Sequence, residues 1–196
     1  MKKLPLLAAD SFKDQFRHVL YEHQMMFDPI FYITSGHATN DRTMFNAILE
    51  SGLVHARNLI YFFSGEKKWN TDIHVSDIDS ALPGLSERLY PLFKGHPEKE
   101  RIHWQICHLT RYRSDNVSEK EWSRPMILQP FLPVVCRFLD EALNSGILVT
   151  GGSDMNTCRR IRALADPGQP DWSNNLIWFV ATSSMDSASV TTYVKD

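Results

Sequence analysis

The chain has 196 residues, of which 43% are hydrophobic and 22% charged, and its formal net charge is -2. These values are typical of a globular protein large enough to bury one core, and they exclude a disordered chain, a collagen and a coiled-coil rod. The near-balanced charge excludes a global attraction to nucleic acid or to an anionic membrane, although a local basic patch is compatible with it.

The cysteines and the hydropathy pattern indicate the class of protein and its compartment. Cys107, Cys136 and Cys158 are widely spaced and form no CxxC motif, so neither a disulfide framework nor a zinc ribbon is expected. No run of about 18 apolar residues occurs, so no membrane-spanning segment is expected. We therefore expect a cytoplasmic protein with reduced thiols and without a cofactor.

Apolar spacing predicts four principal helices, over residues 10–27, 41–63, 97–113 and 118–145. The second is the clearest, because its apolar residues recur at three- and four-residue intervals from Phe45 to Phe63. Gly52 lies inside that stripe. A glycine there weakens a helix by about 1 kcal/mol relative to alanine, so it is expected where a second helix approaches closely.

Shorter elements are expected between and after these helices. Residues 66–75 resemble an exposed connection, short helices are expected near 76–82 and 85–93, and the capping-box pair Ser118 and Glu121 predicts the start of the fourth helix. Its three prolines, at 125, 130 and 133, must kink or divide that helix. Residues 151–154 are predicted to form a loop, and strands at 176–180 and 189–194 would form a hairpin or part of an irregular tail.

These elements favour an all-α fold, a four-helix bundle over residues 1–146, with a tail of residues 147–196 packed on it.

The predicted helix 97–113 has two different faces. Ile102, Ile106 and Leu109 fall on an apolar side, whereas the opposite side carries Arg101, Trp104, His108 and Arg111. That second face is either an anion or nucleic-acid contact surface or a polar seam between helices.

The segment from Arg101 to His108 carries a family resemblance. An arginine followed seven residues later by a histidine on a late helix is similar to HEPN domains, which are helical bundles of bacterial toxin and abortive-infection systems. Residues 46–63, followed by His108-Leu-Thr, also resemble a set of uncharacterised bacterial helical proteins. The resemblance covers about residues 10–145.

The resemblance implies metal-independent RNA cleavage or RNA binding by a homodimer, in bacterial stress or defence. His108 would act as a general acid or base and Arg101 would stabilise the phosphate, with Trp104 and Arg111 as supporting contacts.

His55 and Arg57 on the second predicted helix are further binding candidates. They would form a polar pocket shared with His108, or they would make ion pairs that order helix packing. A metal site from His18 or His23, His55 and His108 would require ligands from separate helices. A di-iron carboxylate site takes a Glu-x-x-His motif from each of two helices, and the chain has one such motif, from Glu100 to His103.

Two other classes of function are also compatible with the sequence. The chain could be a non-catalytic module that binds a protein partner through Trp69, Trp172 or Trp178. It could also be a helical bundle that binds a metal or a small molecule.

Overall fold

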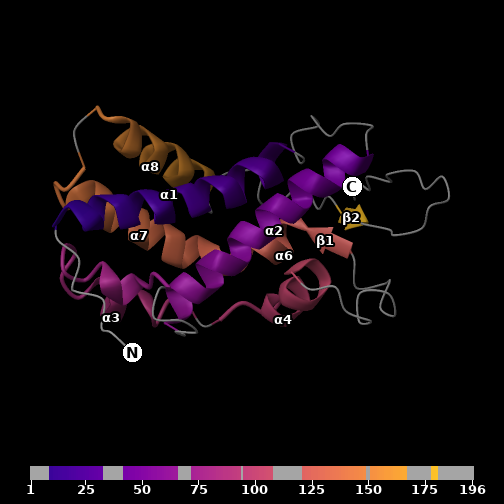
Figure 1. Cartoon of the computed structure of the whole chain (residues 1–196), viewed down its shortest axis with the longest axis horizontal. Coiled ribbons are helices and arrows are strands. Elements are labelled where there is room, and N and C mark those ends of the chain that lie inside the picture. Colours follow the sequence, from indigo (N-terminus) through magenta and orange to yellow (C-terminus); the bar gives the residue numbers. More distant parts are fainter. Residues whose placement is uncertain are drawn as a thin grey trace.

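The computed structural model describes residues 9–32, 42–65, 72–93, 95–107, 121–148, 151–166 and 178–180. Most of these residues are helical, which confirms the expected all-α class (Figure 1). The α-helices are α1 (Ala9–Tyr32), α2 (Arg42–Ser64), α3 (Leu85–Leu89), α4 (Lys99–Ile102), α6 (Arg124–Leu128), α7 (Leu132–Asn144) and α8 (Ser153–Leu164). The remaining elements are the 3-10 turns η2 (Val75–Asp77) and η5 (Gln129–Phe131), the π-helical turn η3 (His103–Cys107), and the strands β1 (Glu121–Ser123) and β2 (Trp178–Val180).

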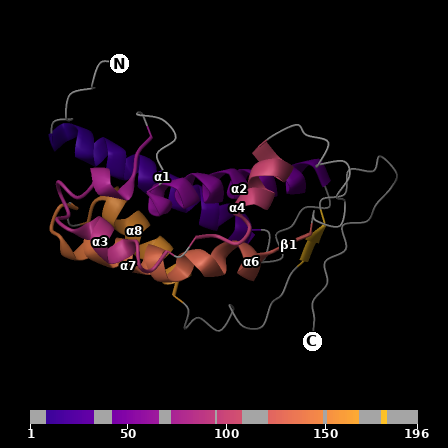
Figure 2. The same cartoon turned by 90° about the horizontal axis from the view of Figure 1, so that it is seen from below.

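The long helices α1 and α2 form one layer of the molecule, and α7 and α8 lie on the other side of the core (Figure 2). Helix α1 packs most extensively against α2, and α8 contacts both α1 and α7. Helix α4 and the turn η3 pack against α2 from its outer side. The termini of α1 and α2 agree with the predicted helices, except that α1 continues through Pro29 to Tyr32.

Gly52 lies where α2 passes closest to α1, as its place in the apolar stripe predicts. A Cβ atom built at this position would lie 3.2 Å from Cγ1 of Ile30 and 3.6 Å from the carbonyl oxygen of Met26. Since Ile30 is fully buried, little space is free for it to move into. The missing side chain therefore sets the separation of the two helices.

The core between the layers is rich in aromatic rings, and it encloses a histidine. His23 is fully buried, with its ring stacked on Phe138 at 5.3 Å and edge-on to Phe63 at 5.7 Å. Its Nδ1 donates a hydrogen bond of 2.7 Å to the carbonyl oxygen of Val19, and its Nε2 has no hydrogen-bond partner within the described residues. Burial lowers the pKa of His23 to about 4, so the imidazole is neutral at physiological pH.

The region of the third and fourth predicted helices differs from expectation. The third helix begins as α4 but passes into the π-helical turn η3, and residues 108–113 lie outside the described part. The expected start of the fourth helix, at residue 118, lies outside the described part, but helix is wrong for Glu121–Ser123, which form β1 and pair antiparallel with β2. The prolines do divide the rest of the fourth predicted helix, into α6, η5 and α7.

The segment after residue 146 contains a helix that the sequence pattern did not predict. A loop is expected at residues 151–154, but α8 begins at Ser153 and buries Met155, Cys158 and Ile161 against the bundle. Their three-residue spacing is the helical signal that the glycines before it obscured. The predicted strand at 176–180 is confirmed over Trp178–Val180, although its partner is β1; residues 189–194 lie outside the described part.

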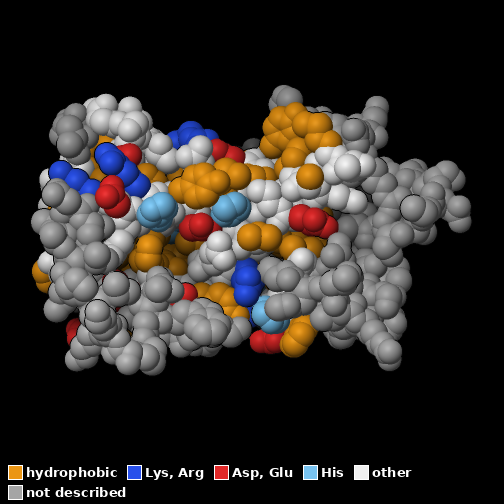
Figure 3. Space-filling model, in the orientation of Figure 1, with side chains coloured by type: hydrophobic (Ala, Val, Ile, Leu, Met, Phe, Trp, Pro, Cys, Tyr) orange, Lys and Arg blue, Asp and Glu red, His pale blue; other side chains and the backbone are white. Residues whose placement is uncertain are grey.

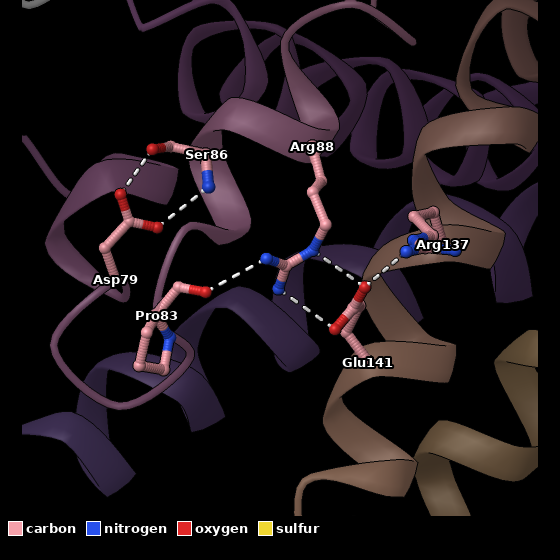
Figure 4. Close-up of polar contacts among 6 residues, drawn as sticks. All are labelled: Asp79, Pro83, Ser86, Arg88, Arg137 and Glu141. Carbon is pink, nitrogen blue, oxygen red and sulfur yellow. Dashed lines mark hydrogen bonds and ion pairs between the residues drawn. The ribbon is translucent and has the colours of Figure 1, made fainter.

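Residues 66–75 are expected to form an exposed connection. This expectation is wrong for its last two residues, because His74 and Val75 are buried. The turns after it are fixed to the bundle by charged side chains (Figure 4). Arg88 donates hydrogen bonds of 2.9 and 3.1 Å to the two carboxylate oxygens of Glu141 on α7. Asp79 accepts hydrogen bonds from the backbone and hydroxyl groups of Ser86.

No helix in the described ranges is long and apolar enough to cross a membrane.

The close approach at Gly52 predicts an order of effects for larger side chains. Gly52→Leu should destabilise the fold by about 1–3 kcal/mol or more, because its extra atoms meet Ile30 in a close-packed site. Gly52→Ala should cost less, since alanine gains about 1 kcal/mol in helix propensity. Urea unfolding of both variants measures these differences, and equal stability of wild type and Gly52→Leu would contradict the tight packing.

His23 predicts a loss of stability in acid. The pKa of His23 is about 4 in the fold, against an ordinary value of 6.5. The unfolded chain therefore takes up a proton between these values that the fold does not, and stability falls by at most about 3 kcal/mol as the pH falls from 6.5 to 4. In His23→Leu, the loss between about pH 7 and pH 4.5 should be smaller in urea unfolding. His18→Gln, at an exposed position of the same helix, serves as the control, and identical pH slopes for wild type and His23→Leu would refute the effect.

Candidate functional site

An open pocket of about 410 Å³ lies where α1 and α2 meet the start of the 72–74 segment. Histidine, acidic and basic side chains gather with hydrophobic ones on the face where α1 and α2 lie side by side (Figure 3). The pocket is lined by His18, Val19, Glu22, Arg57, Asn58, Leu59, Tyr61, Phe62, Asp72 and Ile73. Its size is within the range of small-molecule sites, which also combine an apolar wall with a few polar groups.

Glu22 is the polar centre of the α1 wall. Its Oε2 accepts hydrogen bonds from Nδ1 of His55 at 2.7 Å and from Nδ2 of Asn58 at 2.9 Å. Both donors come from α2, so the bonds also hold the two helices in register. The edge of the Tyr21 ring contacts the His55 imidazole, with the ring centres 5.5 Å apart. Within the described residues, Oε1 of Glu22 has no hydrogen-bond partner, so one oxygen of an oriented carboxylate is available.

Arg57 supplies the positive charge of the α2 wall. Its guanidinium carbon lies 5.4 Å from the centre of the Tyr61 ring, and Nζ of Lys99 lies 5.2 Å from that same ring centre. The Nε atom of Arg57 is buried and has no hydrogen-bond partner in the part of the chain that the structure describes. Arg57 also makes no ion pair with a described carboxylate, although Glu22 and Asp72 line the same pocket.

The structure brings the two candidates on α2 to one site, but in different roles. Arg57 lines the pocket directly. His55 does not line it and acts through Glu22, which it orients. Sequence reasoning does not identify Glu22. Its only sequence signal is a spacing of four residues from His18 on a helix whose other face is apolar.

Arg101 is engaged within the chain. Its Nε lies 2.6 Å from a carboxylate oxygen of Glu98, and its guanidinium carbon lies 4.0 Å from the centre of the Trp122 ring. Its Nη2 is 2.7 Å from Sδ of Met126. Only 16% of the Arg101 side chain is exposed, so the side chain packs between α4, β1 and α6.

Trp104 is the exposed aromatic residue of this region. It is 42% exposed, its Nε1 donates a hydrogen bond of 3.2 Å to Glu100, and its ring meets that of His103 edge-on at 5.0 Å. His108 and Arg111 lie outside the described residues. The pairing of Arg101 with His108, and a site shared by His55 and His108, therefore stay predictions.

Other chemistry has less support in the described residues. No group of three histidine, cysteine or acidic side chains among them is placed to hold a metal ion. Burial raises the pKa of Cys158 to about 12 and also raises the pKa of Cys136, so both thiols are protonated at physiological pH. His96 is a structural histidine, because its Nε2 donates to the carbonyl oxygen of Ile127 at 2.8 Å.

No family model, curated protein or solved structure matches the chain. The functional proposal therefore rests on the geometry of the pocket.

Proposed function

We propose that the protein binds a small ligand with an anionic group in the pocket between α1 and α2. The observation that carries this proposal is Arg57, which lines the pocket and makes no ion pair with a carboxylate of the described part of the chain. A ligand carboxylate or phosphate would pair with its guanidinium through charge-assisted hydrogen bonds.

The surroundings of Arg57 support a binding role. The Tyr61 ring packs against the guanidinium and restricts its orientation, which lowers the entropy lost when a ligand binds. Lys99 on α4 approaches the same ring and adds positive potential. Ile73 adds a partly exposed apolar side chain to the lining, next to the buried Val19, Leu59 and Phe62.

RNA binding or cleavage is a second candidate, and the exposure of Trp104 favours it. An exposed indole beside a histidine is a platform on which an unpaired base can stack. In this candidate the protein acts as a homodimer, as the resemblance to HEPN domains implies, and in the cytoplasm, as its cysteines and hydropathy indicate. His108 and Arg111 follow Trp104 along the chain. The internal contacts of Arg101 make cleavage the less supported of the two RNA activities.

The first proposal predicts that Arg57→Met weakens binding of compact anions. Inorganic phosphate and 4-methylpentanoate are suitable probes, titrated by calorimetry or by NMR shifts of the full chain. Loss of a charge-assisted contact should reduce the affinity for the probe that binds by about tenfold or more. Arg159→Met, at an exposed position on α8, is the matched control and should bind as wild type does. Equal binding by wild type and Arg57→Met, or absence of binding by every probe with a carboxylate or phosphate, would overturn the proposal.

The second candidate predicts binding of single-stranded RNA with quenching of Trp104 fluorescence. Trp104→Ala should weaken this binding by about tenfold, which corresponds to one lost stacking contact. For the catalytic form, RNA should be cleaved in the presence of EDTA, and His108→Ala should abolish cleavage while the circular dichroism spectrum is retained. Binding without cleavage would leave a non-catalytic RNA-binding protein, and absence of both would exclude this candidate.

A further inference from the structure

We propose that the ligand of the α1–α2 pocket is dipolar and carries an ammonium group beside its anionic group, as an amino acid with an apolar side chain does. This inference rests on the proposed function, because it assigns the anionic group to Arg57. It adds a second contact, between the ammonium group and Glu22.

The Glu22 carboxylate is oriented and has one oxygen available to a ligand. Its Oε2 is occupied by the donors of His55 and Asn58, and these two bonds fix the plane of the carboxylate. Its Oε1 has no hydrogen-bond partner within the described residues, and the side chain is 24% exposed. No lysine or arginine of the described part forms an ion pair with Glu22. An oriented carboxylate with one available oxygen is a suitable acceptor for a ligand ammonium.

The opposite charges of the pocket do not pair with each other. Glu22 on α1 and Arg57 on α2 both line the pocket, yet no ion pair joins them. Asn58 contacts Glu22, and its neighbour Arg57 projects about 100° away around the helix. The two charges are thus held on different parts of the wall, with the pocket open to both. A ligand with two complementary charges can contact both groups at once.

Ile73 is the partly exposed apolar residue of the pocket lining, whereas Val19, Leu59 and Phe62 are at most 4% exposed. A ligand that carried only charges would leave the exposed part of Ile73 in contact with water. An amino acid with an aliphatic or aromatic side chain would cover it, and its binding would gain from removing that apolar area from water.

A set of matched ligands tests the inference with the full chain. The probes are L-leucine, L-valine and L-phenylalanine, each compared with its deamino acid and its decarboxylated amine; for leucine these are 4-methylpentanoate and 3-methylbutylamine. We expect at least one amino acid to bind about tenfold more tightly than both of its analogues, since each analogue loses one charge-assisted contact. This comparison uses the wild-type protein, so it does not depend on the folding of a variant.

Two variants then assign the contacts. In Glu22→Gln, the preference for the amino acid over its deamino analogue should disappear. In Arg57→Met, the preference over the amine should disappear, and Arg159→Met should retain both preferences. Equal affinity of the amino acids and their deamino analogues for wild type would overturn the inference, while the proposed function would stand if Arg57→Met still weakened binding. Absence of binding by every probe with a carboxylate or phosphate would overturn both.

Discussion

The close approach of α1 and α2 at Gly52 is the contact on which the rest of the structure depends. With no side chain at this position, the Ile30 side chain of α1 fits directly against the backbone of α2. The same approach brings Glu22 opposite His55 and Asn58, so that helix packing and the polar centre of the pocket share one geometry. A change in helix separation at the glycine would therefore move the two charged walls of the pocket relative to each other.

Three histidines have different roles because they lie in different environments of the fold. His23 is stacked among phenylalanines and is kept neutral by burial. His96 is fixed by a hydrogen bond to a backbone carbonyl and joins the start of α4 to α6. His55 is bonded to a carboxylate at the edge of a pocket, where it orients a group that a ligand can reach. Solvent access and hydrogen-bond partner, rather than the imidazole itself, separate these roles.

The amino-acid sequence was most informative where a pattern is local. The apolar stripe of α2 and its interior glycine predicted both the helix and the close contact correctly, because both arise from side-chain periodicity. Helix α8 was missed because glycines precede it, and β1 was missed because its partner is distant in sequence. Arg57 was a candidate for a polar pocket shared with His108, and it lines the pocket between α1 and α2, while the sharing with His108 stays a prediction. Glu22 was not a candidate, because its role depends on the pairing of two helices. Arg101 was placed on a polar face, but its contact with Trp122 depends on β1, a strand that the helical pattern does not predict.

The pairing of β1 with β2 has a consequence for the order in which the molecule folds. The contacts between α1 and α2 join consecutive helices, and the entropy lost on closing such a short connection is small. The β1–β2 ladder joins segments that are far apart along the chain, and contacts of that kind form late in folding. The helical hairpin with its pocket can therefore assemble as an early unit. The strand that carries Trp122 is paired only when β2, the last described segment, docks on it.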